Sequence, residues 1–166
     1  MKFPSAGSGI VACLATVVLG GSLKVPGESP VEFCDADRES DLVNVQKIDI
    51  AQNPPKAGKP LQITLAAEVR KEIAAGAYVK VTVKYGLIQL LSTTADFCEQ
   101  LGNVDMKCPL EAGQLTVTKS VDLPSVIPPG TYNVFADVYS DDDEQISCMK
   151  ASVNFPRPSL GLEEEL

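Results

Sequence analysis

Cysteine is the residue type with the clearest chemistry in this 166-residue chain, because its thiols can form disulfides or bind metals. Cys13 lies inside an apolar N-terminal run, and the chain continues with Cys34, Cys98, Cys108 and Cys148. These four cysteines can form two disulfides in three pairings. The short bridge from Cys98 to Cys108 is the simplest, and it leaves Cys34 to pair with Cys148. That longer bridge would stabilise the fold by about 4–5 kcal/mol in the chain-entropy model.

Histidine is absent, so the chain lacks Ser-His-Asp and Cys-His pairs of the usual kind. It also lacks the GxSxG, GxGxxG and P-loop motifs, and it has no Cys-x-x-Cys spacing for zinc. The acidic run Asp141–Glu144 could hold calcium, but its spacing does not follow the EF-hand loop, which favours a solvated hairpin tip. We therefore predict a protein that is not an enzyme and uses no metal or cofactor.

The N-terminus has the composition of a signal peptide: one basic residue, the apolar run Ile10–Leu19 and a small-residue end. The run is shorter than the roughly 20 residues of a membrane span, and a buried helix is the alternative interpretation. We predict a signal peptide at 1–21, a linker or propeptide at 22–33, one folded domain at 34–156 and an acidic disordered tail at 157–166. The expected location is the secretory pathway, either secreted or in a vacuolar or lysosomal lumen.

The formal net charge of −8 argues against nucleic-acid binding, whose dominant electrostatic term requires a basic surface. The same charge gives no general attraction to anionic membranes, except where local lysines face them. We therefore predict no nucleic-acid partner and only transient contact with membranes.

Apolar residues alternate with polar ones in residues 61–70, 79–85 and 132–139, which is typical of half-buried strands. The alternation changes phase within 43–50 and within 146–155, and either a β-bulge or a strand that switches faces would explain both changes. Gly-, Pro- and Asp-rich turns separate these segments. The pattern predicts an all-β fold, an antiparallel sandwich of two sheets.

Two segments are more apolar than such a sandwich requires. Residues 85–91 read Tyr-Gly-Leu-Ile-Gln-Leu-Leu, and residues 123–129 read Leu-Pro-Ser-Val-Ile-Pro-Pro. Both should lie near one end of the sandwich, either as ordinary core or as the lip of an apolar cavity. A single helical turn is expected at 71–75.

An ordered set of motifs carries a family resemblance. The set contains Cys-x9-Cys-Pro at 98–109, Pro-Pro-Gly-Thr-Tyr-Asn-Val-Phe-Ala-Asp-Val-Tyr at 128–139 and Cys-x4-Val-x-Phe at 148–155. In this order the chain resembles the ML (MD-2-related lipid-recognition) domain family. The apolar segment 85–91 before the cysteine loop is most similar to fungal phosphatidylglycerol/phosphatidylinositol transfer proteins.

The resemblance implies an immunoglobulin-like sandwich with an internal lipid cavity and the bridges Cys34–Cys148 and Cys98–Cys108. A third bridge of the animal sterol carriers has no cysteines here, because Asn53-Pro54-Pro55 takes its place, which argues against animal-type sterol selectivity. The implied function is a monomeric lipid-transfer protein that carries one phospholipid (phosphatidylglycerol/phosphatidylinositol) or sterol between membranes. The alternative is a secreted immunoglobulin-like protein-recognition module without a ligand cavity.

The expected cavity wall combines inward strand positions with residues of the two apolar segments. The predicted lipid-binding residues are Leu65, Val81, Val83, Tyr85, Leu87, Leu90, Leu123, Ile127, Tyr132, Val134 and Val153. For each of them, plain core packing is the alternative. Lys84 and Lys119 could meet a headgroup phosphate, although a solvated strand face is the preferred interpretation of both. Enclosing a chain of about sixteen carbons would offset on the order of 10 kcal/mol of exposure to water.

Overall fold

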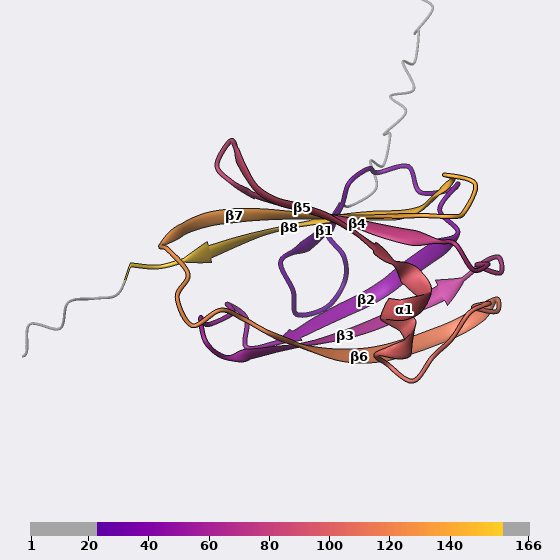
Figure 1. Cartoon of the computed structure of the whole chain (residues 1–166), viewed down its shortest axis with the longest axis horizontal. Coiled ribbons are helices and arrows are strands. Elements are labelled where there is room, and N and C mark those ends of the chain that lie inside the picture. Colours follow the sequence, from indigo (N-terminus) through magenta and orange to yellow (C-terminus); the bar gives the residue numbers. More distant parts are fainter. Residues whose placement is uncertain (1–22, 158–166) are drawn as a thin grey trace, which may run out of the picture.

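Two antiparallel β-sheets face each other in the computed structural model, which describes residues 23–157 (Figure 1). The larger sheet has the order β1 (Val31–Phe33), β8 (Gln145–Phe155), β7 (Gly130–Tyr139), β4 (Tyr78–Tyr85) and β5 (Ile88–Asp96). The smaller sheet has the order β2 (Val43–Ala51), β3 (Pro60–Val69) and β6 (Gly113–Asp122). The predicted all-β sandwich is therefore confirmed.

The predicted phase changes are bulges that keep apolar side chains between the sheets. In β2 the register shifts between Val45 and Lys47, so Val45 and Ile48 are both buried. In β8 the register shift leaves Ile146 without a partner residue in β7, and the neighbouring residues Ile146 and Ser147 are both buried. Without these bulges, the period of two would turn each strand's apolar residues toward solvent along half its length.

The segment before β2 closes one side of the sandwich (Figure 1). β1 pairs with β8 of the larger sheet, while the N–H of Ile48 in β2 donates to the carbonyl of Pro26 at 2.9 Å. Val25 is fully buried between them. Residues 23–33, where a linker or propeptide was expected, thus pack on the domain, and cleavage in this segment stays a prediction. Residues 1–22 and 158–166, which include the predicted signal peptide and nearly all of the acidic tail, lie outside the described residues.

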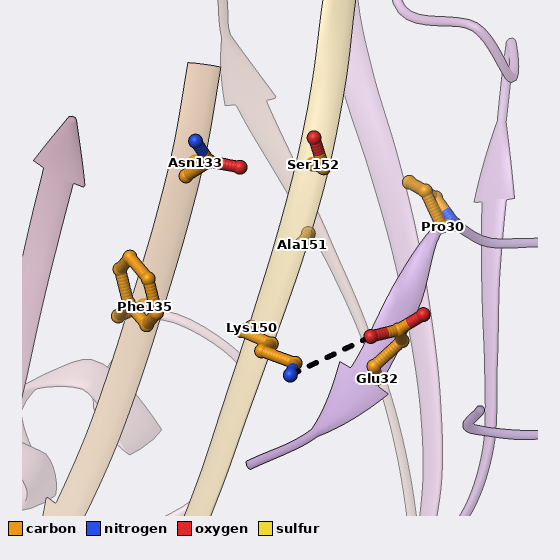
Figure 2. A pocket seen from close by; sticks show the side chains of 7 residues that line it. All are labelled: Pro30, Glu32, Asn133, Phe135, Lys150, Ala151 and Ser152. Atoms are coloured by element: carbon orange, nitrogen blue, oxygen red, sulfur yellow. Dashed lines mark ion pairs between the residues drawn. The ribbon is translucent and has the colours of Figure 1, made fainter. Parts of the chain in front are cut away.

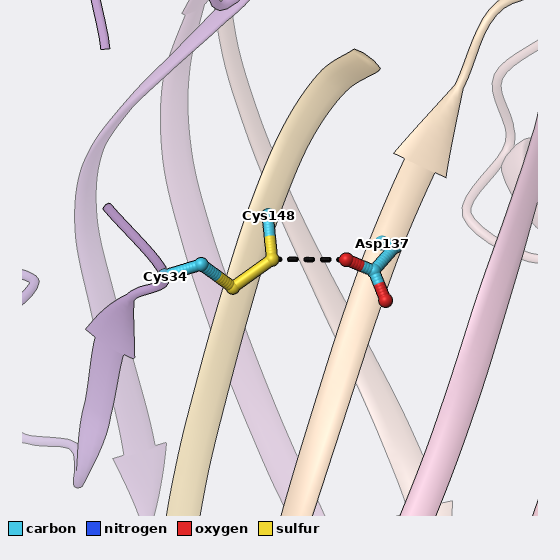
Figure 3. Close-up of side chains that lie close together, drawn as sticks. All are labelled: Cys34, Asp137 and Cys148. Carbon is cyan, nitrogen blue, oxygen red and sulfur yellow. Dashed lines mark hydrogen bonds between the residues drawn. A yellow bond between two sulfur atoms is a disulfide. The ribbon is translucent and has the colours of Figure 1, made fainter. Parts of the chain in front are cut away.

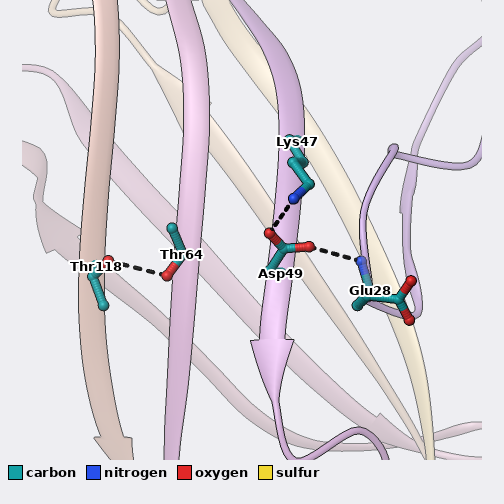
Figure 4. A network of polar contacts seen from close by, with 5 residues as sticks. All are labelled: Glu28, Lys47, Asp49, Thr64 and Thr118. Atoms are coloured by element: carbon teal, nitrogen blue, oxygen red, sulfur yellow. Dashed lines mark hydrogen bonds and ion pairs between the residues drawn. The ribbon is translucent and has the colours of Figure 1, made fainter.

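Gly27 allows this segment to approach β2. Its φ is +112°, and a Cβ there would overlap the carbonyl oxygen of Ile48 and approach Asp49 Oδ1 to 2.9 Å. Asp49 also accepts the N–H of Glu28 at 2.9 Å and pairs with Lys47 at 2.6 Å (Figure 4). The hydrogen bonds from Lys47 and then from the Glu28 N–H hold the pKa of Asp49 below its ordinary value. These contacts lie on the outer, polar side of the smaller sheet.

Both expected disulfides are present, Cys34–Cys148 and Cys98–Cys108. Asp137 Oδ1 lies 3.0 Å from Cys148 Sγ, which brings a carboxylate and two cysteines together on the outer side of the larger sheet (Figure 3). The disulfide consumes both thiols, so this cluster offers no thiolate to a metal.

The expected helical turn at 71–75 is wrong, because Ile73 instead forms an isolated β-bridge with Leu110 and is buried. The helix that residues 23–157 do contain is α1 (Phe97–Gly102), which the sequence reasoning did not predict. Asp96 caps it by accepting the N–H of Glu99 at 2.9 Å. No helix in the described part of the chain is long and apolar enough to cross a membrane.

The acidic run Asp141–Glu144 forms the turn between β7 and β8, as the hairpin interpretation requires. Tyr78 donates a hydrogen bond to Asp143 at 2.8 Å, and this bond raises the pKa of the Tyr78 hydroxyl. The turn lies at the end of the sandwich where β4 begins.

Candidate functional site

An apolar cavity of about 280 Å³ lies between the two sheets. Three of its lining side chains are polar: Gln100, Lys119 and Ser147. The other lining residues come from both sheets, α1 and the loop after it: Val43, Val45, Ile63, Leu65, Phe97, Leu101, Val104, Leu110, Leu115, Val117, Val138, Ile146 and Met149. Such a wall suits a hydrocarbon ligand, and the volume is near the lower end of the roughly 300–1,000 Å³ usual for small-molecule sites.

One end of the cavity is closed by α1 and the Cys98–Cys108 loop. Leu101 of α1 and Leu110 after the loop are both buried, in one cluster with Val69 and Ile146. α1 also contacts β4 and β5, so it covers this end between the sheets (Figure 1). The deep end is therefore built from packed apolar side chains.

The apolar wall continues from the cavity toward the opposite end of the larger sheet. Strand alternation places Val134 on the same face as Val138, and Val153 on the same face as Met149. Val83 lies opposite Val134 in the β4–β7 register, so it shares that face. All three are half-buried, whereas close-packed sheets would bury them. The smaller sheet therefore does not fully cover this part of the inner face.

Three aromatic rings stand where this wall ends. Tyr132 packs edge-on against Tyr85 and Phe155, with ring centroids 5.2 and 5.6 Å apart. The hydroxyl of Tyr85 donates to the carbonyl of Pro129 at 3.1 Å, and that of Tyr132 donates to Pro128 at 2.8 Å. These bonds hold the proline-rich segment 123–129 against the end of the larger sheet.

The same end carries an exposed apolar rim, made of the β4–β5 turn and the proline-rich segment. Leu87 is fully exposed, and Ile88, Leu90 and Val126 are exposed at 64%, 55% and 81%. A hollow of about 540 Å³ is lined by Val126, Pro128, Pro129, Phe155 and the loop around Lys56. Exposed apolar patches are typical of surfaces that contact a protein, a membrane or a ligand.

A separate depression of about 260 Å³ lies on the outer face of the larger sheet (Figure 2). Phe135, Asn133 and Ser152 line it, and the Lys150–Glu32 ion pair at 3.7 Å borders it. Phe135 and Lys150 alternate with the inward residues of β7 and β8, so this site faces solvent and has no connection through the sheet to the cavity. Its mixed polar lining does not suit a hydrocarbon.

Comparison with known proteins agrees with the cavity. Residues 28–155 match the sequence model of the ML domain. The phosphatidylglycerol/phosphatidylinositol transfer protein of Pyricularia oryzae is 51% identical over 144 residues, which cover 87% of this chain and 81% of that protein. The protein of the same name from Neurospora crassa is 46% identical over 153 residues, covering 91% of this chain and 86% of the relative. This chain belongs to the ML-domain family.

Solved structures show the same fold for this ML domain. A Niemann-Pick type C2 protein from the Japanese carpenter ant superposes with a TM-score of 0.53 at 14% identity, covering 74% of this chain and 96% of the other. Chicken MD-1 in complex with lipid IVa has a TM-score of 0.53 at 18% identity, covering 81% and 96%. The likeness at this low identity concerns the fold.

The structure of the ML domain divides the predicted lipid-binding residues into three groups. Leu65 lines the cavity, and Val81, Val83, Val134 and Val153 extend its wall along the larger sheet. Tyr85 and Tyr132 belong to the aromatic group, Ile127 lines the hollow beside Phe155, and half-buried Leu123 donates its N–H to the carbonyl of Lys59 at 3.4 Å. Leu87 and Leu90 lie on the exposed rim instead of between the sheets. Of the first group only Leu65 lines the cavity itself, and lipid contact by each of the predicted residues stays a prediction.

Most of the deep wall was missed by the sequence reasoning, including Leu101, Leu110 and Met149. The sequence contained a signal for the wall residues of β6, which are Leu115, Val117 and Lys119. They alternate with Thr116 and Thr118 in the same pattern that predicted the other strands. The preferred solvated interpretation of Lys84 is consistent with its place on the outer face, where its ammonium lies 5.1 Å from the Phe135 ring. For Lys119 that interpretation is wrong, because its side chain is half-buried and lines the cavity.

Proposed function

We propose that this ML domain binds one phospholipid, of the phosphatidylglycerol or phosphatidylinositol type, between its sheets and transfers it between membranes. The observation that carries the proposal is the apolar cavity whose wall continues, half-buried, to an exposed apolar rim. The names of the fungal relatives, at 46–51% identity over most of both chains, support the same phospholipid class. A sterol is the alternative ligand that the same wall could accept.

Hydrocarbon transfer explains why the site needs little polar chemistry. Each methylene removed from water is worth about 0.8 kcal/mol, so a chain leaving a bilayer must be covered throughout its passage. The Val, Leu and Ile side chains on the inner faces of the two sheets provide this cover, so the sandwich needs no additional element to enclose the chain. A surface-recognition module with a solid core would have no use for the void, and this favours the carrier over that alternative.

We further propose that the rim of Leu87, Ile88, Leu90 and Val126 touches the membrane during loading and release. The rim lies at the open end of the wall, so a lipid could pass from bilayer to cavity without crossing water. Lys56 lines the adjacent hollow and could add local attraction to anionic headgroups, although the chain as a whole is acidic. The domain is expected to act as a monomer.

Export through the secretory pathway fits the two disulfides, which persist in oxidising compartments. We propose the signal peptide at 1–21, the folded domain with its boundary near 156 and the acidic tail at 157–166 as the organisation of the chain. Sequencing the N-terminus of the mature protein would test the first boundary. A mature protein that begins after Phe33 would show that the packed segment 23–33 is removed.

Transfer between vesicles tests the function. Donor vesicles containing fluorescent phosphatidylglycerol, quenched by high concentration, are mixed with unlabelled acceptor vesicles and the purified protein. The proposal predicts dequenching whose rate rises with protein concentration. A rate equal to that without protein, for phosphatidylglycerol, phosphatidylinositol and sterol alike, would refute it.

A further inference from the structure

Lys119 is a charged side chain on the wall of an otherwise apolar cavity. It projects from the inner face of β6, in phase with Leu115 and Val117, and lies opposite Ile63 of β3. Lysine is rarely turned toward an interior unless a partner compensates its charge. Neither of the two ion pairs found among residues 23–157 involves Lys119.

The partner that Lys119 does have is neutral. Its Nζ donates to Oε1 of Gln100 in α1 at 2.9 Å, and this bond is partly buried. The same Oε1 accepts from Asn103 Nδ2 at 3.5 Å, which helps to orient the amide. An ammonium has three donors, so two remain for another acceptor, and neither ion pair of residues 23–157 gives Lys119 a carboxylate partner. Gln100 therefore positions the lysine without neutralising it.

Lys119 lies between the apolar part of the cavity and its opening, which is where the polar headgroup of an acyl lipid would lie if its chain filled the cavity. Leu115 and Val117 lie toward the closed end of the cavity, where the lining is apolar apart from Ser147 and Gln100. Val121, the next inward residue after Lys119, is already 39% exposed. The ammonium thus lies where the buried wall gives way to the opening, on the edge strand of the smaller sheet, which contacts α1 through Gln100.

We propose that Lys119, positioned by Gln100, binds the anionic group of the lipid whose chain fills the cavity. This inference rests on the proposed carrier function and adds the basis of its ligand preference. The shared chemistry is an oxyanion attached to a hydrocarbon chain, either the phosphate of a phospholipid or the carboxylate of a free fatty acid. A charge-assisted hydrogen bond at this half-buried position contributes selectivity that hydrocarbon walls cannot supply.

The test compares ligands that share a chain and differ in charge. Displacement of a fluorescent acyl probe gives dissociation constants for phosphatidylglycerol, oleate and uncharged diacylglycerol in wild type and in Lys119→Met. Loss of a hydrogen bond to a charged group should weaken the binding of an anionic ligand roughly tenfold or more and leave diacylglycerol unchanged. Weakening of phosphatidylglycerol alone identifies the phosphate as the source, and weakening of oleate alone identifies the carboxylate.

Two variants serve as controls. Lys119→Arg keeps the charge and should keep the preference for the anionic ligand. Lys84→Met removes a lysine from the outer face and should change none of the three constants. Unchanged anionic binding in Lys119→Met, relative to diacylglycerol, would overturn the role of Lys119 alone. Failure of the wild-type protein to bind any of the three lipids would overturn the carrier function with it.

Discussion

Filling the void between the sheets should stabilise the lipid-free protein while abolishing lipid binding. Val117→Phe places a ring on the inner face of β6, opposite Leu65 and beside Lys119, inside the 280 Å³ cavity. The substitution adds four carbons, worth about 0.8 kcal/mol each if fully covered, so partial covering leaves about 1–2 kcal/mol of stabilisation. Insertion of the same carbons into a close-packed interior would instead cost about 1–3 kcal/mol. The sign of the change in unfolding free energy therefore shows whether there is empty space between the sheets at Val117.

Urea unfolding of delipidated protein, followed by circular dichroism, measures the change as a shift in midpoint at constant slope. The matched control is Thr116→Phe, the neighbouring residue on the exposed outer face, which should alter stability by no more than about 0.5 kcal/mol and leave lipid binding intact. Destabilisation by Val117→Phe beyond 1 kcal/mol, with the control unchanged, would refute the reasoning, because it would show close packing between the sheets.

Three other perturbations have defined outcomes. Leu87→Asp on the exposed rim should slow vesicle transfer several-fold at unchanged lipid affinity, and equal loss of both would contradict a role confined to membrane contact. Because the pKa of Asp49 is lowered, its carboxylate stabilises the fold at pH values above the ordinary pKa of 3.8, and this stabilisation is lost as the pH falls through the folded pKa. Lys47→Met removes the largest cause of the lowering, so an NMR titration should show the pKa of Asp49 moving up toward 3.8. Replacing Cys34 and Cys148 by alanine should lower the unfolding free energy by roughly 5 kcal/mol, since the bridge spans 114 residues, and chemical denaturation showing a loss below 1 kcal/mol would argue against the entropic account.

The strands and sheets of this fold are encoded locally, and the sequence predicted them well. Alternation in residues 61–70, 79–85 and 132–139 corresponds to β3, β4 and β7. The loss of phase within 43–50 corresponds to a bulge in β2. A period of two decides which face is buried wherever one side of a strand meets water, and this requires no knowledge of distant residues.

The separation of the sheets is not encoded locally. Val83 and Val134 have the same alternation whether they interlock with the opposite sheet or line a void, because that difference depends on segments distant in the sequence, such as α1 at one end of the sandwich. α1 is only six residues long, too short for a recognisable helical period. The rim residue Leu87 was predicted to contact lipid from its apolar type, and only the tertiary structure places it outside the wall.

Lys119 illustrates a signal that was present and underweighted. Its phase with Leu115 and Val117 indicated an inward side chain, while its charge favoured solvent. The charge usually decides such conflicts in an ordinary core. In a sandwich with a cavity the conflict is resolved by Gln100, which lies on a helix that the sequence did not reveal.

Native mass spectrometry of the protein isolated from its own source tests the central claim most directly. If the inner faces enclose a lipid, the gentle spectrum should contain one added mass per chain, and its fragmentation should release a phospholipid or a sterol. The same mass should be missing from Val117→Phe prepared in parallel. A wild-type spectrum containing only the bare chain, from protein that also takes up no lipid from vesicles, would contradict the account.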